Sequence, residues 1–430
     1  MRNFKFNELS AAEYKKLINR PSINLDKIFK VVQPILSNIK KNGVKAAENF
    51  AKQFDGFDGD ELRVSKKEFE EAEKNLDGNI KNALENAAEN IEKFHSNQKS
   101  KSYEVETVAG VKCSREFRAV ENVGLYVPGG SAILPSTMLM LGIPAKIAGC
   151  KRVVAVSPVK GNNVNDPLLF AAKLCGVNEF YKIGGAQAIG LLAYGDADIP
   201  KVYKIFGPGN QYVTAAKMLV SIDSEGCAID MIAGPSEVLI IADDNANPSF
   251  VAADLLSQAE HGTDSQVILI SDSENKINEI NAELEIQLKI LPRKDLAEKS
   301  LGNSFSLLVN NLDEAVEFSN NYAPEHLILN IKNAEQIKEQ VQNAGSVFIG
   351  NYSPESAGDY ASGTNHSLPT SGFAKSFGGV TVESFMKSIT FQELSKEGLT
   401  NISNTIETLA ETEGLFAHKN AVTIRLKKKL

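Results

Sequence analysis

Two residues that can bind a metal ion stand three positions apart near the middle of the chain. Gln258 and His261 lie in the segment SQAEHG, and this spacing places both side chains on one side of a helix. An imidazole is a common zinc ligand, whereas a glutamine is an uncommon one. The alternative is that His261 only caps the helix, whose C-terminal end favours a protonated imidazole. On this segment alone, the cap is the favoured interpretation.

A second pair of candidates, Glu325 and His326, lies in the segment NNYAPEHLIL, directly before an apolar stretch. Adjacent residues of an extended chain point in opposite directions, so the two side chains could act in different steps. One would serve as a base on water and the other as a base on an alcohol. The alternative is a polar turn ahead of a strand, because a single EH dipeptide is weak evidence.

Two segments nearer the C-terminus add further candidates. The loop 353–372 is long and rich in small residues, and it contains Asp359 and His366. Long loops in compact domains are often functional, although an aspartate can also simply organise a turn. The segment ETEGLFAHKNA contributes Glu413 and His418, which a surface arm would equally explain. Four of the five histidines thus lie in loops or at helix ends, which fits a metal or acid–base site better than a core role.

Three glycine-rich segments form another group of candidates, at residues 126–137, 183–190 and 206–214. Each leads from a predicted strand toward a helix, where backbone amides can bind an anion. None matches GxGxxG, so the usual dinucleotide fingerprint is absent. The alternative is a set of tight strand–helix turns, which need glycine for positive φ. Three such loops in succession are consistent with a nucleotide-binding crevice.

The elements that must position these residues alternate between strand and helix from about residue 104. Strands at 237–242 and 267–271 flank a helix, for which Asn247 is a suitable N-cap, Pro248 a suitable first residue and Gly262 a suitable stop. Further short apolar runs predict strands at 123–127, 152–157, 179–183, 204–206, 307–309, 327–329 and 346–349. This alternation is typical of a doubly wound parallel sheet.

Helices are expected on both sides of this region. Residues 1–100 carry apolar residues three and four apart, and Ser65 with Glu68 forms a possible capping box. His95 lies on the apolar stripe of one such helix and is expected to be structural. From about residue 380 the chain is predicted to be helical again, with a short strand at 421–425. This tail is too small to have its own core, so it should pack on the body or on a partner subunit.

Composition excludes several classes of protein. Of the 430 residues, 43% are hydrophobic, which is enough for a sizeable core. The chain is too long for one ordinary domain, so two or more domains are expected. The net charge is −8, and the only dense basic run, 425–429, gives no indication of nucleic-acid binding. No apolar run approaches the ~20 residues of a membrane span, and the N-terminal stretch lacks the apolar region of a signal peptide. The four cysteines show no CxxC spacing, so we expect buried thiols in a cytoplasmic protein.

Taken together, these segments resemble the histidinol dehydrogenase family. The resemblance follows the family's order from about residue 120 to the C-terminus and rests on GLYVPGG, GGAQAI, KIFGPGN, IDMIAGPSEVLIIAD, DLLSQAEHG, APEHLI, SPESAGDYASGTNH, QELSKEG and LAETEGLFAHKNAVT. No single segment is specific, but their combination is. The resemblance reverses the preference for a simple helix cap at His261.

The resemblance implies a role for each residue that matches a family motif. The implied zinc ligands are Gln258, His261, Asp359 and His418. The implied acid–base pair is Glu325 and His326. The implied substrate contacts are the four zinc ligands together with Ser236, His326, His366 and Glu413. The implied NAD contacts, one in each glycine-rich loop, are Tyr126, Gln187 and Asn210.

The implied reaction is the zinc-dependent, two-step oxidation of L-histidinol through L-histidinal to L-histidine by NAD⁺, which completes histidine biosynthesis. Zinc would mainly anchor and orient the substrate rather than polarise the reacting oxygen. The implied assembly is a homodimer in which the C-terminal arm reaches into the partner's site. That arrangement would bring Glu413 and His418 to the neighbouring subunit.

The fold expected from the pattern and the resemblance is α/β, with two Rossmann-like parallel-sheet domains and helical N- and C-terminal extensions. The larger domain would be discontinuous, comprising residues 21–120 and 237–380. Residues 121–236 would form the second, NAD-binding domain. Residues 1–20 would be an N-terminal extension, and residues 381–430 an arm for dimerisation.

Two other functions compete with this interpretation. A zinc- and NAD-dependent dehydrogenase of the same fold could act on another small alcohol, although the intact Glu413 and His418 argue against it. A zinc hydrolase could use Glu325 as the base on metal-bound water, and the glycine-rich loops would then be only turns. A non-catalytic binding protein is the least favoured, because every family position expected to do chemistry is filled.

Overall fold

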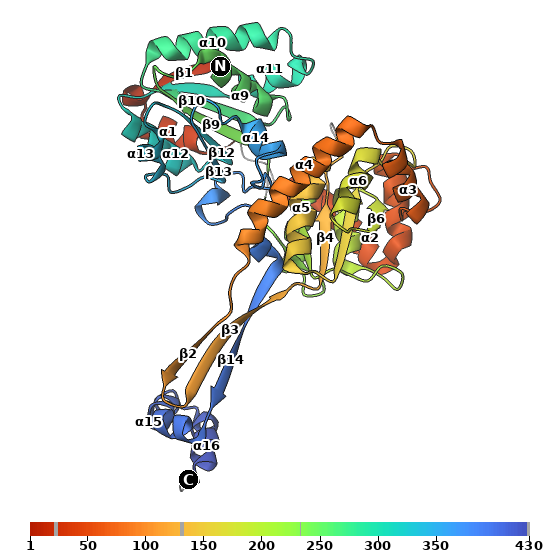
Figure 1. Cartoon of the computed structure of the whole chain (residues 1–430), viewed down its shortest axis with the longest axis vertical. Coiled ribbons are helices and arrows are strands. Elements are labelled where there is room, and N and C mark those ends of the chain that lie inside the picture. Colours follow the sequence, from red (N-terminus) through yellow and green to blue (C-terminus); the bar gives the residue numbers. More distant parts are fainter. Residues whose placement is uncertain (21–24, 130–132, 233, 428–430) are drawn as a thin grey trace.

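The chain is built on three sheets. The computed structural model describes residues 1–20, 25–129, 133–232 and 234–427, so part of the first glycine-rich loop and the last basic residues lie outside the described ranges. Within those ranges the strands form sheets of six, five and three strands. Figure 1 shows two compact bodies, each built on one of the larger sheets, and a long arm that projects away from them. The parallel sheets of the two bodies confirm the predicted α/β class.

The six-stranded sheet is parallel, with strand order β1-β11-β10-β9-β12-β13. Its strands are β1 (Arg2–Lys5), β9 (Glu237–Ala242), β10 (Gln266–Ser271), β11 (Phe305–Leu308), β12 (His326–Asn330) and β13 (Ser346–Ile349). The helices of this body are α1 (Ala11–Ile18), α9 (Pro248–Ala259), α10 (Glu274–Leu288), α11 (Lys294–Gly302), α12 (Leu312–Tyr322), α13 (Ala334–Lys338) and α14 (Glu355–Tyr360). Every residue of β9, β10 and β12 is buried, as expected for a parallel sheet covered on both faces.

The five-stranded sheet is also parallel, with strand order β6-β5-β4-β7-β8. Its strands are β4 (Asn122–Tyr126), β5 (Arg152–Ser157), β6 (Glu179–Lys182), β7 (Lys204–Phe206) and β8 (Ala228–Ile229). The helices of this body are α2 (Leu25–Phe50), α3 (Lys66–Asn75), α4 (Gly78–His95), α5 (Pro135–Ala148), α6 (Asp166–Leu174), α7 (Gly185–Tyr194) and α8 (Gln211–Ile222). Each of the three glycine-rich loops follows a strand of this sheet.

The N-terminal helices pack differently from the prediction. Helix α2 contacts α7 and α8, α3 contacts α6, and α4 contacts α5, so these helices belong to the five-stranded body. The assignment of 21–120 with 237–380 is therefore wrong for these helices, because helical periodicity identifies a buried face but not the surface that covers it. Residues 1–20 are more than an extension, since β1 pairs with β11 at the edge of the six-stranded sheet.

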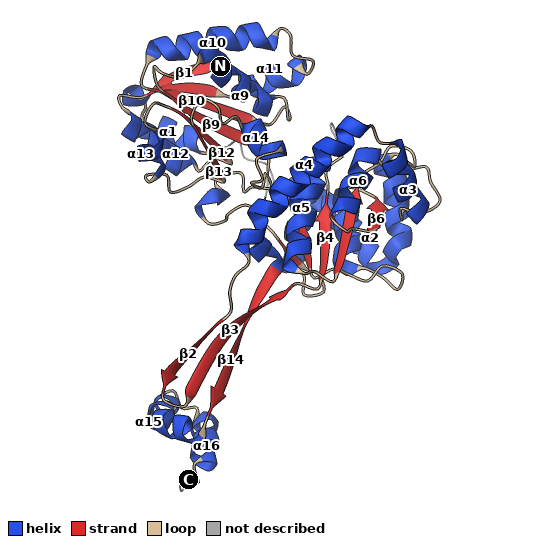
Figure 2. Cartoon of the chain, in the orientation of Figure 1, coloured by secondary structure: helices blue, strands red, loops and turns tan. Residues whose placement is uncertain are grey.

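The arm consists of an antiparallel sheet and two helices. Strands β2 (Tyr103–Val108), β3 (Val111–Ala119) and β14 (Met386–Leu394) are joined at their far end to α15 (Lys396–Thr412) and α16 (Phe416–Arg425), as Figure 2 shows. The expectation of helix from about 380 missed β14, which is largely exposed and so carries no clear burial pattern. The predicted strand at 421–425 is wrong because these β-branched residues pack as part of α16.

Several local predictions are confirmed. Strand β9 has the predicted limits, and the Asn247 side chain caps α9 by accepting a hydrogen bond from the Ser249 amide at 3.0 Å. Ser65 and Glu68 form the predicted capping box. Gly262 is not the stop of α9, because the helix already ends at Ala259 with Glu260 as its C-cap.

Other features bear on the excluded classes. His95 is fully buried, and its Nδ1 lies 2.9 Å from the Ile91 carbonyl oxygen, so its position is structural. All four cysteines are free, and Cys175 is buried. Burial raises the pKa of Cys150, Cys175 and Cys227 to about 12, which makes these thiols poor nucleophiles. Among the described helices, none is long and apolar enough to cross a membrane.

Candidate active site

The predicted acid–base pair lies where two neighbouring strands of the six-stranded sheet begin. His326 is the first residue of β12, and it stands beside β9, whose first residue is Glu237. The Nδ1 atom of His326 lies 3.1 Å from the Glu237 carbonyl oxygen. A carbonyl oxygen only accepts hydrogen bonds, so Nδ1 carries the proton and Nε2 carries a lone pair.

The lone pair of His326 is available for chemistry. Nε2 is buried and has no hydrogen-bond partner among the described residues, and it lies 3.9 Å from Oδ1 of Asp359. Burial lowers the pKa of His326 to about 3, so the ring is neutral at physiological pH. A buried polar atom without a partner is costly, and active sites are where such atoms are retained. The geometry of His326 therefore leaves Nε2 free to accept a proton.

Glu325 directly precedes β12, next to His326 in the chain. Its Oε2 atom accepts a hydrogen bond from the Glu237 amide at 2.9 Å, and the side chain is buried. Burial, reinforced by the nearby carboxylates of Glu237 and Asp359, raises the pKa of Glu325 well above its usual range. A carboxyl group with a raised pKa is a typical general base or acid.

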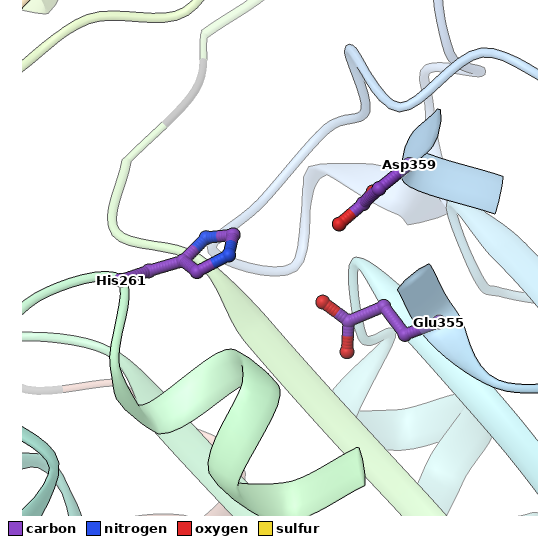
Figure 3. A group of neighbouring side chains, drawn as sticks. All are labelled: His261, Glu355 and Asp359. Carbon is purple, nitrogen blue, oxygen red and sulfur yellow. The ribbon is translucent and has the colours of Figure 1, made fainter. Parts of the chain in front are cut away.

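A cluster of possible metal ligands lies beside this pair. Three side chains each offer one ligand atom, and these atoms lie within 4.8 Å of one another: His261, Glu355 and Asp359. Figure 3 shows the three side chains converging. Glu355 and Asp359 come from α14, and His261 follows the C-terminus of α9. Imidazole nitrogen and carboxylate oxygen are donors that zinc accepts. The donor set thus fits a divalent cation such as zinc.

Gln258 joins this cluster from the last turn of α9. The side chain is fully buried, and the amide nitrogen in its best-satisfied orientation donates to both carboxylate oxygens of Glu355. Burial raises the pKa of Glu355 well above its usual range and that of Asp359 to about 6. Protein atoms around the His261 imidazole partly desolvate it and so lower its pKa, although the residue as a whole is exposed. Buried acids of this kind are better accommodated when a cation is present.

His366 connects this site to the other body of the molecule. Its Nδ1 lies 3.0 Å from the Asp359 carbonyl oxygen, and its Nε2 lies 3.1 Å from Oγ1 of Thr137 in α5. Because Nδ1 must donate to the carbonyl, Nε2 accepts from the threonine hydroxyl. Burial lowers the pKa of His366 to about 4, so this imidazole is also neutral. Ser236, which directly precedes β9, is half-buried at the same edge of the sheet.

Two of the predicted site residues lie elsewhere in the chain. Glu413 is the C-cap of α15 and His418 belongs to α16, and both are exposed at the far end of the arm. Figure 1 shows that this end lies well away from the six-stranded sheet. One copy of the chain therefore does not bring these residues to its own site.

The three predicted NAD-contacting residues lie on the five-stranded body and already have structural partners. The Tyr126 hydroxyl accepts a hydrogen bond from the Gly185 amide at 3.1 Å. The Gln187 side-chain nitrogen lies 3.2 Å from the Asp55 carboxylate. The Asn210 side chain caps α8 by accepting from the amides of Tyr212 at 3.0 Å and Val213 at 3.1 Å. These contacts agree with the interpretation of the loops as strand–helix turns. They give no information on whether the same residues contact a cofactor.

The anion sites expected at the glycine-rich loops are partly filled by the protein itself. The Asp55 carboxylate accepts from the Gly184 amide at 2.9 Å, at the N-terminus of α7. In the third loop, Gly207 has a φ of 115°, and a Cβ atom there would lie 2.1 Å from the Tyr126 carbonyl oxygen. Lys217 donates to the Gly207 carbonyl at 2.8 Å, and Asp230 accepts from the Gly207 amide at 2.8 Å. The third loop is thus fixed by its backbone contacts.

The sequence interpretation missed two residues of this site. Glu355 had a detectable signal, because it stands four residues before Asp359 and a helix places such residues on one face. Glu237 had no signal, since it opens an apolar strand and its function depends on contacts with distant segments. Both are more than nine-tenths buried.

Comparison with known proteins gives a consistent result. The family model described as histidinol dehydrogenase matches residues 18–426. The chain is 51% identical to a histidinol dehydrogenase of Bacteroides fragilis over 416 residues, covering 96% of this chain and 97% of the relative. It is 50% identical to the chloroplastic histidinol dehydrogenase of Arabidopsis thaliana, covering 99% of this chain and 92% of the relative.

A solved structure shares the whole architecture. The crystal structure of histidinol dehydrogenase from Elizabethkingia anophelis matches with a TM-score of 0.95 and 49% sequence identity. The match covers 99% of this chain and 98% of that one. The two bodies and the arm described above are therefore the architecture of that enzyme.

Proposed function

The chain belongs to the histidinol dehydrogenase family, a family of oxidoreductases in histidine biosynthesis, and from this premise we propose that it oxidises L-histidinol to L-histidine at the amino ends of β9 and β12. We propose NAD⁺ as the acceptor and zinc as the metal. The observation that carries this proposal is the buried, neutral His326, whose Nε2 has no partner among the described residues. An alcohol hydroxyl is a group that can donate a hydrogen bond to such an atom and pass it the proton as the hydride leaves.

In the first oxidation, His326 Nε2 takes the proton of the substrate hydroxyl. The backbone carbonyl of Glu237 holds the opposite ring nitrogen and stabilises the imidazolium that results. In the second oxidation, Glu325 takes a proton from the water that adds to the aldehyde, for which its raised pKa suits it. NAD⁺, when bound, supplies the acceptor for the hydride of each step.

The metal would be held by His261, Asp359 and Gln258, with Glu355 beside them. When bound, zinc supplies a Lewis acid that attracts the amine and imidazole nitrogens of histidinol. The residues around it would orient the substrate carbon toward His326.

We propose a homodimer, because the arm exposes apolar side chains on both of its faces. Tyr103 and Val105 lie on one face and Ile389 and Phe391 on the other, all at least 39% exposed. Exposed apolar surface of this kind needs a cover. A second copy would cover it and could supply Glu413 and His418 to the site. A cytoplasmic location is part of the same proposal.

The reaction is tested by following NADH with L-histidinol, with and without a chelator. Two NADH formed for each histidinol consumed, histidine as the product, and loss of activity that zinc reverses would support the proposal. No NADH from histidinol but turnover of another small alcohol would replace the substrate. No NADH from any alcohol would contradict a dehydrogenase and favour a hydrolase.

The shared site is tested by mixing two inactive variants, His261→Asn and His418→Ala. After subunit exchange, mixed dimers hold one site in which both mutations lie and one site with neither. Activity should therefore return in part, and its absence in demonstrably mixed dimers would contradict a site shared between subunits.

A further inference from the structure

We propose that the ion pair between Arg20 and Glu237 positions the Glu325–His326 pair for catalysis. The proposal rests on the function proposed above for that pair. Arg20 lies 305 residues before Glu325 in the chain, and no motif of the family resemblance includes it. It is a positioning residue in this proposal, because it touches neither the substrate nor the reacting atoms.

Arg20 binds Glu237 through two parallel hydrogen bonds. Its Nε donates to Oε1 at 2.8 Å and its Nη2 donates to Oε2 at 2.7 Å. Both side chains are largely removed from water, at 14% and 3% exposure. A bidentate arginine–carboxylate pair fixes orientation as well as charge, which a lysine does not do. The pair therefore holds the first residue of β9 in one geometry.

The main chain of Glu237 holds both catalytic groups. Its amide donates to the Glu325 carboxylate at 2.9 Å, and its carbonyl oxygen accepts from Nδ1 of His326 at 3.1 Å. The main chain of Glu237 is thus hydrogen-bonded to both members of the pair. Any rotation of its backbone would displace the base on water and the base on the alcohol together.

Arg20 also holds the chain segment that leads into the catalytic pair. Its guanidinium donates to the carbonyl oxygens of Tyr322 at 2.5 Å and Ala323 at 3.1 Å, and it stacks 3.6 Å from the centre of the Tyr322 ring. Ala323 has a φ of 55°, in the left-handed region that non-glycine residues rarely adopt, and Glu325 follows two residues later. The arginine thus stabilises a strained turn directly before the catalytic glutamate.

A third segment meets the same ion pair. The amide of Ser371 donates to Oε1 of Glu237 at 2.9 Å, and this residue belongs to the loop that carries His366. Arg20 and Glu237 therefore join the start of β9, the entry to β12 and the end of the loop 353–372. None of their hydrogen bonds reaches Gln258, His261 or Asp359. The ion pair should consequently affect the catalytic step and leave metal binding unchanged.

The matched control is the ion pair between Arg152 and Glu179 in the five-stranded body. Arg152 also forms two parallel bonds, at 2.8 and 2.5 Å, and also donates to a carbonyl oxygen, that of Pro200, at 2.7 Å. Its side chain is 21% exposed. Arg152→Ala thus removes similar contacts and similar stability at a place remote from the catalytic pair.

The experiment compares Arg20→Ala with Arg152→Ala in the metal-loaded, full-length protein. We expect kcat with L-histidinol to fall about 100-fold in Arg20→Ala, as a displacement of about 1 Å can cause. KM and metal content should change less than about threefold in both variants, and kcat of Arg152→Ala should stay near the wild-type value. Added guanidinium ion should restore part of kcat in Arg20→Ala only, while Arg20→Lys should remain impaired because one ammonium does not replace the fork.

An unchanged kcat in Arg20→Ala would overturn the proposal, as would a loss confined to KM or to metal content. If Arg20→Ala does not fold, Arg20→Lys and Glu237→Gln decide the question by the same measurements. His326→Gln is measured in parallel. Full activity of that variant would refute the proposed role of the catalytic pair, whereas an inactive His326→Gln beside a fully active Arg20→Ala would refute only the positioning role.

Discussion

The two larger sheets carry their candidate functional segments at opposite ends of their strands. In the six-stranded sheet, Glu237 and His326 are the first residues of β9 and β12, so the site lies at the amino ends. In the five-stranded sheet, the glycine-rich loops follow β4, β6 and β7, so they lie at the carboxyl ends. Ligands of open α/β sheets usually bind at carboxyl ends. The candidate site of the six-stranded sheet lies away from that usual position, whereas the glycine-rich loops of the five-stranded sheet lie at it.

The helix ends at these two places explain the departure. Helices that run back along a parallel sheet present their C-termini to the amino ends of the strands and their N-termini to the carboxyl ends. A helix C-terminus carries partial negative charge and favours cations, whereas an N-terminus favours anions. His261 directly follows the C-terminal cap of α9, which suits a metal ion. The starts of α7 and α8 suit an anionic or polar acceptor, and there the Asp55 carboxylate and the Asn210 side chain already accept hydrogen bonds from backbone amides.

The two regions also differ in how completely their polar groups are paired. In the five-stranded body, Asn210, Asp55 and Lys217 all have hydrogen-bond partners. In the six-stranded body, Nε2 of His326 has none among the described residues, and the pKa values of Glu325 and Glu355 are raised. Unpaired groups and perturbed pKa values gather at catalytic sites. The comparison therefore favours the six-stranded body as the place of the proposed chemistry.

The largest effect that would test this comparison is on catalysis. His326→Gln removes the only base proposed for the hydroxyl proton, and it should slow alcohol oxidation by about 10²–10⁴-fold, the range of general-base catalysis. Oxidation of added L-histidinal should fall less, since Glu325 is the proposed base on the water. Single-turnover measurements of the two half-reactions provide the test. Equal losses in both would contradict the division of roles between the two residues.

The next effect is on stability and belongs to the other body. Lys217 and Asp230 form an ion pair in which both side chains are at most 4% exposed. Lys217→Met leaves Asp230 buried without its partner and should lower the free energy of unfolding by about 3–5 kcal/mol, as measured by denaturant titration. The double variant with Asp230→Leu should recover much of this loss. If Lys217→Met lowered kcat without lowering stability, the proposed contrast between a structural and a catalytic body would be wrong.

The sequence predicted most of the framework of both regions. Parallel strands covered on both faces are short apolar runs, and for that reason the limits of β5, β7 and β9 were predicted as observed; the limits of β13, which is only half-buried, were also predicted as observed. The strand β14 was not predicted: the tail from about residue 380 was expected to be helical, although Ile389 and Phe391 alternate with polar residues as on one face of a strand.

The contacts between distant segments could not be predicted in the same way. The sequence of α9 alone did not decide whether His261 caps the helix or binds a metal ion, since both roles give the same local sequence pattern. Nothing in the sequence linked Arg20 to Glu237, because their interaction joins segments 217 residues apart. Local patterns record which face of an element is buried, and they do not record which polar groups meet there.

A smaller effect distinguishes cofactor contact from helix capping at Asn210. Replacing an N-cap asparagine by alanine costs about 1 kcal/mol, so Asn210→Ala and the matched Asn247→Ala should lose similar stability. Only Asn210→Ala should raise KM for NAD⁺ if the residue also contacts the cofactor. An unchanged KM would leave Asn210 as a cap alone. Asn210→Asp retains the capping oxygen and separates the two contributions.

The smallest effect concerns the pH dependence of stability at Asp55. Burial raises the pKa of this carboxyl despite its hydrogen bonds from Gly184 and Gln187, so its ionisation costs folding free energy. Below its ordinary pKa the group is protonated in both states and this cost is absent. The cost grows as the pH rises through the folded-state pKa and is constant above it. Asp55→Asn cannot ionise, so its stability relative to the wild type should increase over that interval.

Asp196 in the same body provides the control of opposite sign. Burial tends to raise its pKa, but hydrogen bonds from the amides of Val44, Ile199 and Asp198 outweigh burial and lower it. Its carboxylate therefore stabilises the fold above its ordinary pKa, and this contribution is lost as the pH falls through the folded-state pKa. Denaturant titrations of Asp55→Asn and Asp196→Asn from acidic to neutral pH, each compared with the wild type, should give slopes of opposite sign. Slopes of the same sign would contradict the raised pKa of Asp55 and would mean that its carboxylate also stabilises the fold.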